Sequence, residues 1–173
     1  MIALRLVRLI ETNADKLADS LVEKLGTSVQ TSGLHGISRR DLRDRCLEIY
    51  SHLSDWLLHK SGSDIEERFA HVGELRARQN VPLADVIWGI LLTKSHLWSF
   101  LEQQAFLQGP LELHGELEFL RLLDQFFDRA IYFLARGYEK GRALAAISRT
   151  ESGKGRRSGD SILAAAAFEP PVQ

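Results

Sequence analysis

Glu66–Leu101, EERFAHVGELRARQNVPLADVIWGILLTKSHLWSFL, decides the fold of this chain. The stretch opens with a charged helical pattern that carries His71. Pro82 then begins a second helical segment, which is almost free of charge and contains Trp88 and Trp98. A helix that is apolar on nearly every side is expected at the centre of a bundle, because water is a poor neighbour for all of its faces. The stretch therefore predicts an all-α fold with this segment at its centre.

Helical periodicity continues on both sides of this stretch, and no strand pattern competes with it. Ser38 is placed to cap one helix, with Asp41 in its first turn. Ser63 and Glu66 have the spacing of a capping box at the start of the next. We predict a bundle of about five main helices, with a long helix last, over residues 2–25, 38–59, 63–80, 82–104 and 111–146.

The composition bounds the class of protein. The chain has 173 residues, of which 45% are hydrophobic and 26% charged, and its formal net charge is −1. This balance predicts one globular domain and argues against nucleic-acid binding, which needs a clustered basic face. The single cysteine, Cys46, excludes an intrachain disulfide. The longest apolar run, Val86–Leu92, is far shorter than the roughly 20 residues of a membrane span, so we expect a soluble, cytoplasmic protein without a membrane partner.

The two ends of the chain differ in character. Residues 1–146 carry the helical pattern and form the predicted domain. Residues 147–173 are small, charged and without periodicity, which predicts a disordered tail.

The last predicted helix has two apolar stripes instead of one. A bundle core needs only one such face, so the surplus predicts contact with a second copy of the chain. The alternative is a long helix covered on both sides by its own neighbours. The stripe that we assign to a homodimer interface consists of Phe119, Leu123, Phe126, Ala130 and Phe133.

No catalytic motif stands out. The chain lacks a nucleophile elbow, a phosphate-binding glycine loop, zinc-cysteine spacing and a paired-carboxylate motif, so we expect a non-enzymatic protein. One weaker pattern could bind a divalent metal, although a solvated helix face explains it equally well. It runs along one side of the second helix through Glu48, His52, Asp55 and His59.

His71 raises the alternative of a haem sensor. Haem would require His71 to face a large apolar cavity, which Trp88, Leu91 and Trp98 of the next helix could line. The same aromatic residues could line a small-molecule pocket or pack in an ordinary core. His71 lies on the flank of its helix, so a hydrogen bond to a neighbouring group accounts for it at least as well.

The chain also resembles a known family. RFAHVGELRARQNVPLADVIWGILLTKSHLWSFLEQQ and LEFLRLLDQFFDRAIYFLARGYEKG are similar to the N-terminal sensor domains of RsbR-type proteins, the RsbT co-antagonists of bacterial stress-signalling complexes. The resemblance covers about residues 5–142 and rests on helix character and on Arg76, Pro82, Leu83, Trp88 and the stretch 128–138.

This resemblance implies a globin-like, all-helical domain that is dimeric, lacks haem and signals through partner proteins. Family members usually continue into an output domain, such as a STAS domain, so we expect this chain to signal through a partner chain. A fainter similarity to globin-coupled sensors, in which a histidine ahead of an aromatic helix binds haem, keeps the haem alternative open. The interval between His71 and Pro82 is longer than that motif implies.

Overall fold

The chain is built from helices throughout residues 2–104 and 110–165, which the computed structural model describes; side chains are described for residues 5–104 and 117–147. This confirms the predicted all-α fold with a long C-terminal helix. In chain order the elements are α1 (Ile2–Thr12), α2 (Ala14–Thr27), the 3₁₀ helix η1 (Val29–Leu34), α3 (Arg39–Ser51), the π-helical turn η2 (Asp55–His59), α4 (Gly62–Arg78), α5 (Leu83–Gln104) and α6 (Pro110–Ala165).

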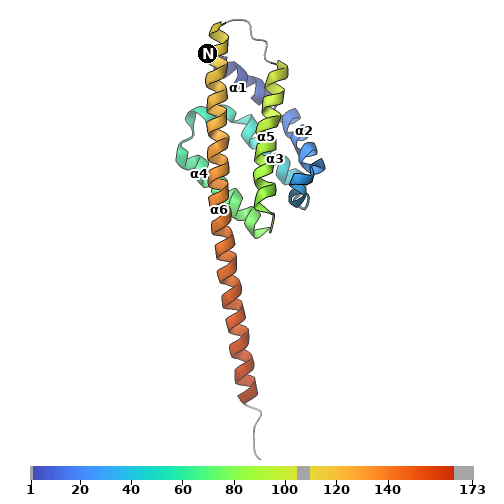
Figure 1. Ribbon diagram of the computed structural model, residues 1–173, viewed down its shortest axis with the longest axis vertical. Coiled ribbons are helices and arrows are strands. Elements are labelled where there is room, and N and C mark those ends of the chain that lie inside the picture. Colours follow the sequence, from blue (N-terminus) through green and yellow to red (C-terminus); the bar gives the residue numbers. More distant parts are fainter. Residues whose placement is uncertain (1, 105–109, 166–173) are drawn as a thin grey trace, which may run out of the picture.

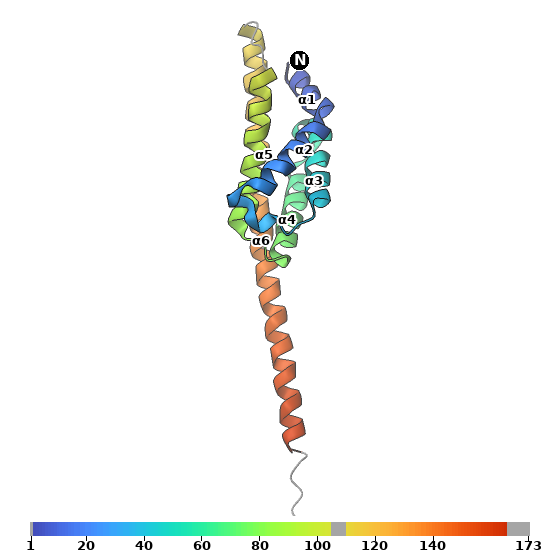
Figure 2. The same ribbon diagram turned by 90° about the vertical axis from the view of Figure 1, so that its right-hand side faces the viewer.

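Helix α6 forms the axis of the molecule. In Figure 1 it runs beside α5 and past α4, and its lower half extends well beyond the other helices. Figure 2 shows α1, α2 and α3 on one side of the body, with α5 and α6 on the other. Among these described segments, no helix has both the length and the apolar character that crossing a membrane requires.

The extension of α6 differs from the expectation for the end of the chain. The helix continues past Ala146 to Ala165, through most of the segment predicted to be disordered. No proline interrupts the chain before Pro170, so nothing in this stretch blocks helical hydrogen bonding. The prediction for residues 166–173 lies outside the described residues.

The first predicted helix is divided in two at Asn13. Its backbone departs from helical geometry (φ −103°, ψ 12°), and its side-chain amide donates a 2.8 Å hydrogen bond to the Leu9 carbonyl. An asparagine that bonds the backbone in this way competes with the regular helical ladder. The chain therefore bends between α1 and α2.

The second predicted helix also breaks, at His52. Residue His52 has φ −126° and ψ 31°, and the chain resumes as η2. The Glu11 carboxylate of α1 accepts hydrogen bonds from the Ser54 amide (2.9 Å) and hydroxyl (2.7 Å). These bonds satisfy polar groups at the break, where the helix itself does not.

The predicted N-terminal cap of α3 is observed, whereas that of α4 is formed by other residues than predicted. Ser38 accepts a 3.1 Å hydrogen bond from the Asp41 amide, as predicted. The capping box of α4 is formed by Ser61 and Asp64, not by Ser63 and Glu66, so the helix begins two residues earlier than expected. Asn80, with φ 56°, makes the left-handed turn before Pro82 and α5.

Aromatic side chains fill the core between α4, α6 and η2. The Trp56 and Phe69 rings have centroids 6.4 Å apart, Trp56 and Phe126 6.0 Å, and Phe69 and Phe126 5.7 Å. Phe127 continues the cluster at 5.3 Å from Phe126. Such tilted and edge-on contacts contribute beyond the burial of their area.

Candidate functional site

A central cavity of about 110 Å³ lies inside the bundle. Five α-helices and η1 contribute to its wall, so the cavity is a product of the whole fold and not of one motif. Its lining is mainly apolar, which suits a small apolar ligand with few polar groups. The lining residues are Leu25, Leu34, Leu42, Arg45, Cys46, Ile49, Tyr50, Arg68, Phe69, Val72, Arg76, Val86, Gly89, Ile90, Thr93 and Leu134.

Tyr50 supplies the free polar group of this cavity. The residue is fully buried, and its hydroxyl has no hydrogen-bond partner among the described residues. Burial, together with the nearby Cys46, raises the pKa of the Tyr50 hydroxyl, so the group stays protonated. A buried hydroxyl without a partner carries a desolvation cost that a ligand with a polar atom can relieve.

The other polar groups of the cavity are occupied or inert. The Thr93 hydroxyl donates a 2.8 Å hydrogen bond to the Gly89 carbonyl within α5. Burial raises the pKa of the Cys46 thiol to about 12, so it is neither a nucleophile nor a ready metal ligand at neutral pH. Among these neutral polar side chains, the Tyr50 hydroxyl is the one without a partner in the described part of the chain, and it is buried away from solvent.

Three arginines line the same cavity, and each is held by an ion pair. Asp41 accepts hydrogen bonds of 3.2 Å from both Arg45 and Arg76, and Arg68 pairs with Glu48. Burial raises the pKa of the Asp41 carboxyl, but the hydrogen bonds from the two arginines outweigh it and leave the pKa below its usual value. The Arg76 and Arg68 pairs join α4 to α3, while the Arg45 pair lies within α3, so each of the three arginines is already engaged.

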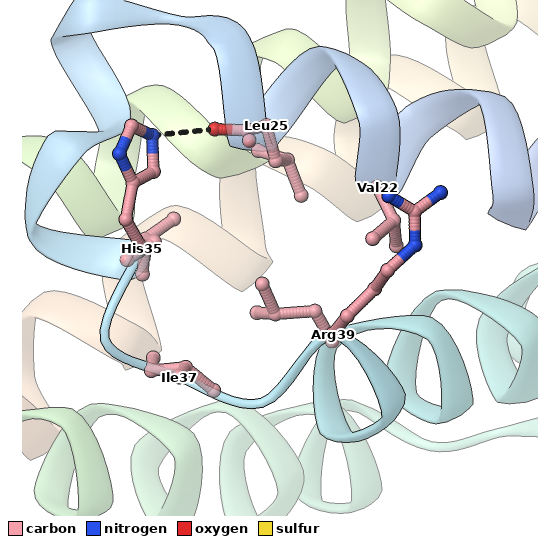
Figure 3. Close-up of a pocket in the computed structure, with 8 residues that line it drawn as sticks. Val22, Leu25, His35, Ile37 and Arg39 are labelled. Carbon is pink, nitrogen blue, oxygen red and sulfur yellow. Dashed lines mark hydrogen bonds between the residues drawn. The ribbon is translucent and has the colours of Figure 1, made fainter.

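An outer pocket of about 310 Å³ adjoins the central cavity (Figure 3). His35 and Arg39 lie on opposite sides of it, and the His35 Nε2 atom is 3.1 Å from the Leu25 carbonyl oxygen. Three leucines line both spaces, so only apolar side chains separate them. These shared residues are Leu25, Leu34 and Leu42.

The residues considered for haem are not brought together. His71 is exposed and lines a shallow surface hollow beside Trp56 and Arg68. Trp88 and Leu91 are 42% and 38% exposed on α5, and neither of them lines that hollow or the central cavity. Because haem ligation needs a histidine that faces an enclosed apolar space, this arrangement does not fit a haem site.

The exposure of Trp88 and Leu91 also corrects the expectation for α5. The helix is buried on one side only, through residues such as Gly89 and Leu97. Its apolar character all round reflects an uncovered apolar side and not a position at the centre of the bundle.

The predicted metal stripe is also dispersed. The helix breaks at His52, whose Nδ1 atom lies 3.1 Å from the Glu48 backbone carbonyl. The Glu48 carboxylate pairs with Arg68, while Asp55 and His59 pair with each other at 3.4 Å. Among the described residues, no cluster of three or more histidine, cysteine or acidic side chains could hold a metal ion.

The stripe assigned to the dimer interface lies inside the chain's own core. Phe119, Leu123 and Ala130 are fully buried, Phe126 is 3% exposed, and Phe133 packs against the core from a half-buried position. The alternative, in which neighbouring helices cover this stripe, is therefore the observed one. Helices α1, α4 and α5 supply that cover.

A different apolar surface remains open, and we call it the α5–α6 face. It comprises Trp88 and Leu91 on α5 and, on the other side of the Lys94–Asp124 ion pair along the helices, Leu117 of α6, which is 56% exposed. Between the two helices, Lys94 Nζ lies 2.9 Å from an Asp124 carboxylate oxygen and 3.8 Å from Asp128. A surface with large exposed apolar side chains around an ion pair is typical of a protein–protein contact.

Comparison with known proteins gives one match. The family model of the RsbT co-antagonist protein rsbRD N-terminal domain matches residues 15–152. No curated protein and no solved structure matches the chain. The matched range includes α3, α4 and α5 whole, most of α2, and α6 as far as residue 152.

Proposed function

Because this chain belongs to the family of RsbT co-antagonist rsbRD N-terminal domains, we propose that it is a haem-free, globin-like regulatory domain that works as a homodimer through partner proteins. The family points to a regulatory role in bacterial stress signalling. A non-enzymatic role agrees with the central cavity, where the thiol is protonated and the arginines are already paired.

The observation that carries the dimer proposal is the exposed α5–α6 face. Trp88 and Leu91 sit one helical turn apart, so they present a continuous apolar surface. A second copy that is related by a two-fold axis would cover this surface on both chains at once. Tryptophan is among the residues that contribute most to such contacts.

Helix α6 supports signalling through a partner. The helix contributes Leu117 to the α5–α6 face and continues beyond the body to Ala165 (Figures 1 and 2). One continuous helix therefore connects the α5–α6 face with the far end of α6, so a movement at the face can be transmitted along it. We place the contact with the output protein on the extension, after Ala146.

The dimer proposal is tested by the mass of the purified protein in solution. The 19.5 kDa chain should sediment as a dimer at micromolar concentration, and replacing Trp88 and Leu91 together by glutamate should give a monomer. Val29→Glu is the matched control, because Val29 is 82% exposed and lies on η1. A wild-type monomer at tens of micromolar, or equal dissociation in the control, would refute the proposal.

The haem-free proposal is supported by the exposed position of His71 and by a central cavity that has no histidine in its lining. Titration with haemin should leave the absorption of the protein without a stoichiometric Soret band. A band that appears in the wild type and disappears in His71→Ala would restore the haem alternative.

The central cavity supports a second role in addition to dimerisation, the sensing of a small-molecule ligand. Its unpartnered Tyr50 hydroxyl is the specific observation, because a buried polar group of this kind accommodates a ligand that completes its hydrogen bonding. We propose a small, largely apolar molecule with one polar atom as the ligand.

A further inference from the structure

A further hollow lies between α2 and the C-terminal half of α5, whereas Trp88 and Leu91 lie in the N-terminal half of α5. The two helices are neighbours in the bundle (Figure 1), and the space between them has a volume of about 280 Å³. We call it the α2–α5 hollow. Its size is close to the lower end of the range for small-molecule sites, which begins at about 300 Å³.

His96 is the buried polar group of this hollow. The residue is 8% exposed, and neither ring nitrogen has a hydrogen-bond partner among the described residues. Burial, with a smaller contribution from the charge of Lys24, lowers the pKa of His96 to about 4. The ring is therefore neutral at neutral pH, and both of its nitrogens are buried away from solvent.

The charge of the lining is positive. Lys16 and Lys24 line the hollow from α2, and no acidic residue lines it. Neither lysine forms an ion pair within the described part of the chain. The acids on α2 nearest to Lys16, Asp15 and Asp19, are instead paired with Arg43 of α3 at 2.8 and 2.6 Å.

The remaining lining adds neutral donors and an apolar wall. Ser20 and Ser99 bring hydroxyl groups from the two helices, and Phe100 lies beside them. The ammonium groups of the two lysines and the hydroxyl groups of the two serines line one space with hydrogen-bond donors. Such a set is complementary to an oxygen-bearing anion, and hydrogen bonds to a charged group are the stronger kind.

We propose that the α2–α5 hollow binds a small oxyanion, with its charge between Lys16 and Lys24 and beside the buried His96 ring. The shared chemistry is a phosphate or carboxylate group on a small molecule. The proposal is independent of the dimer, because no residue that lines the hollow belongs to the α5–α6 face.

Binding should take up a proton. An anion beside His96 favours the charged imidazolium and so opposes the burial that keeps the ring neutral. The charged groups that line the hollow are Lys16 and Lys24 of α2, and α5 contributes none. The affinity should therefore increase as the pH falls, in the direction that protonates His96.

The test is calorimetric titration of the full chain with inorganic sulfate, inorganic phosphate and acetate at constant ionic strength, at pH 6.0 and 7.5. Sulfate remains a dianion at both pH values, so its pH dependence reports on the protein. We expect one saturable site per chain and several-fold tighter sulfate binding at pH 6.0. Tighter binding of phosphate or of acetate then identifies the natural group as a phosphate or a carboxylate.

Variants separate the roles of the residues. Lys24→Gln should weaken sulfate binding at least tenfold at both pH values, and it alters an exposed side chain that the fold does not need. His96→Gln should retain binding at pH 7.5 and lose the pH dependence. Lys60→Gln, beside Trp56 and in the lining of a different pocket, is the matched control and should bind like the wild type.

The proposal is overturned if none of the three anions shows saturable binding at millimolar concentration. It is also overturned if Lys60→Gln weakens binding as much as Lys24→Gln, since that would indicate general charge attraction. Neither result bears on the mass of the dimer, so failure here and failure of the proposed function are distinguishable.

Discussion

Gly73 of α4 lies directly against the backbone carbonyl of Leu134 in α6. A Cβ atom at Gly73 would overlap that oxygen and would lie 2.7 Å from the Tyr138 amide nitrogen. On α6, Gly137 meets the backbone of Ala70 in the same way. The two helices thus touch backbone to backbone, which only glycine permits at these positions.

Gly73→Ala should therefore destabilise the fold, because no flexible side chain is there to move aside. We expect a loss of about 2–3 kcal/mol in the free energy of unfolding, typical of an overpacked contact. Gly26→Ala is the matched control within α2, since nothing lies within 4 Å of its added Cβ. Urea denaturation followed by circular dichroism measures both, and an unchanged midpoint in Gly73→Ala would contradict the close contact.

Asp41 links two arginines, and its loss should weaken the packing of α3 on α4. Arg76 is buried, so Asp41→Asn leaves its charge with only the 2.6 Å hydrogen bond to the Gln79 side chain. Because Asp41 is itself partly exposed, we expect about 1–2 kcal/mol of destabilisation. Asp44→Asn, which removes an exposed pair with Arg40, should cost almost nothing in the same denaturation experiment. Equal losses in the two variants would show that the buried arginine does not depend on Asp41.

The stability of the fold should fall in mild acid because of His96. Its folded pKa of about 4 lies below the ordinary value of 6.5, so the unfolded chain takes up a proton that the folded chain refuses. The stabilisation is complete above pH 6.5 and is lost as the pH falls toward 4. Allowing for solvent at the ring edge, we expect about 2 kcal/mol over that range.

Denaturation at pH 7 and pH 5 tests this prediction, since carboxylates contribute mainly below that interval. His96→Gln should show a flatter dependence than the wild type between these two pH values. A wild-type curve with the same slope as the variant would remove His96 as the cause.

Tyr50→Phe should leave the fold intact or make it slightly more stable. The substitution removes a buried hydroxyl that has no partner and keeps the ring that packs in the core. We expect a gain of up to about 1 kcal/mol, because an unsatisfied polar group is lost without creating a cavity. Tyr138→Phe is the informative contrast, because the Tyr138 hydroxyl donates a 2.6 Å hydrogen bond to the Val81 carbonyl. Loss of this bond should lower the free energy of unfolding by about 1 kcal/mol. Destabilisation of Tyr50→Phe by as much as Tyr138→Phe would reveal a partner for Tyr50.

The sequence predicts the helices well because their signals are local. Periodicity, Ser38 and Pro82 place most of the elements within a few residues of their observed ends. The two breaks that it misses, at Asn13 and His52, depend on side-chain hydrogen bonds and on Glu11. Those contacts are settled by tertiary structure, which a local pattern does not contain.

The faces of the helices are harder to predict than their bounds. The Phe119 stripe is apolar because something covers it, but periodicity does not distinguish a neighbouring helix from a second chain. For the same reason the sequence does not show that Trp88 stays exposed on a helix that is apolar all round. The angles and positions at which the helices cross decide which of these faces is covered.

The unpartnered side chains of the central cavity and of the α2–α5 hollow are also not predicted from the sequence. Tyr50 has apolar neighbours in the sequence, such as Ile49 and Leu53, so a tyrosine there looks like an ordinary core residue. His96 lies in an apolar helix without a motif around it. What distinguishes these residues is a missing partner, and partners come from other elements of the fold.

Because α6 extends beyond the body, a small tilt of the helix within the body displaces its far end by a larger distance. Residues 147–165 rise about 28 Å along the helix axis beyond Ala146. A tilt of about 10° at the crossing with α4, near Gly137, would carry the far end of α6, about 42 Å away along the helix, through about 7 Å. The glycine contacts at Gly73 and Gly137 place the pivot of this lever where backbone meets backbone, without side chains to absorb the motion.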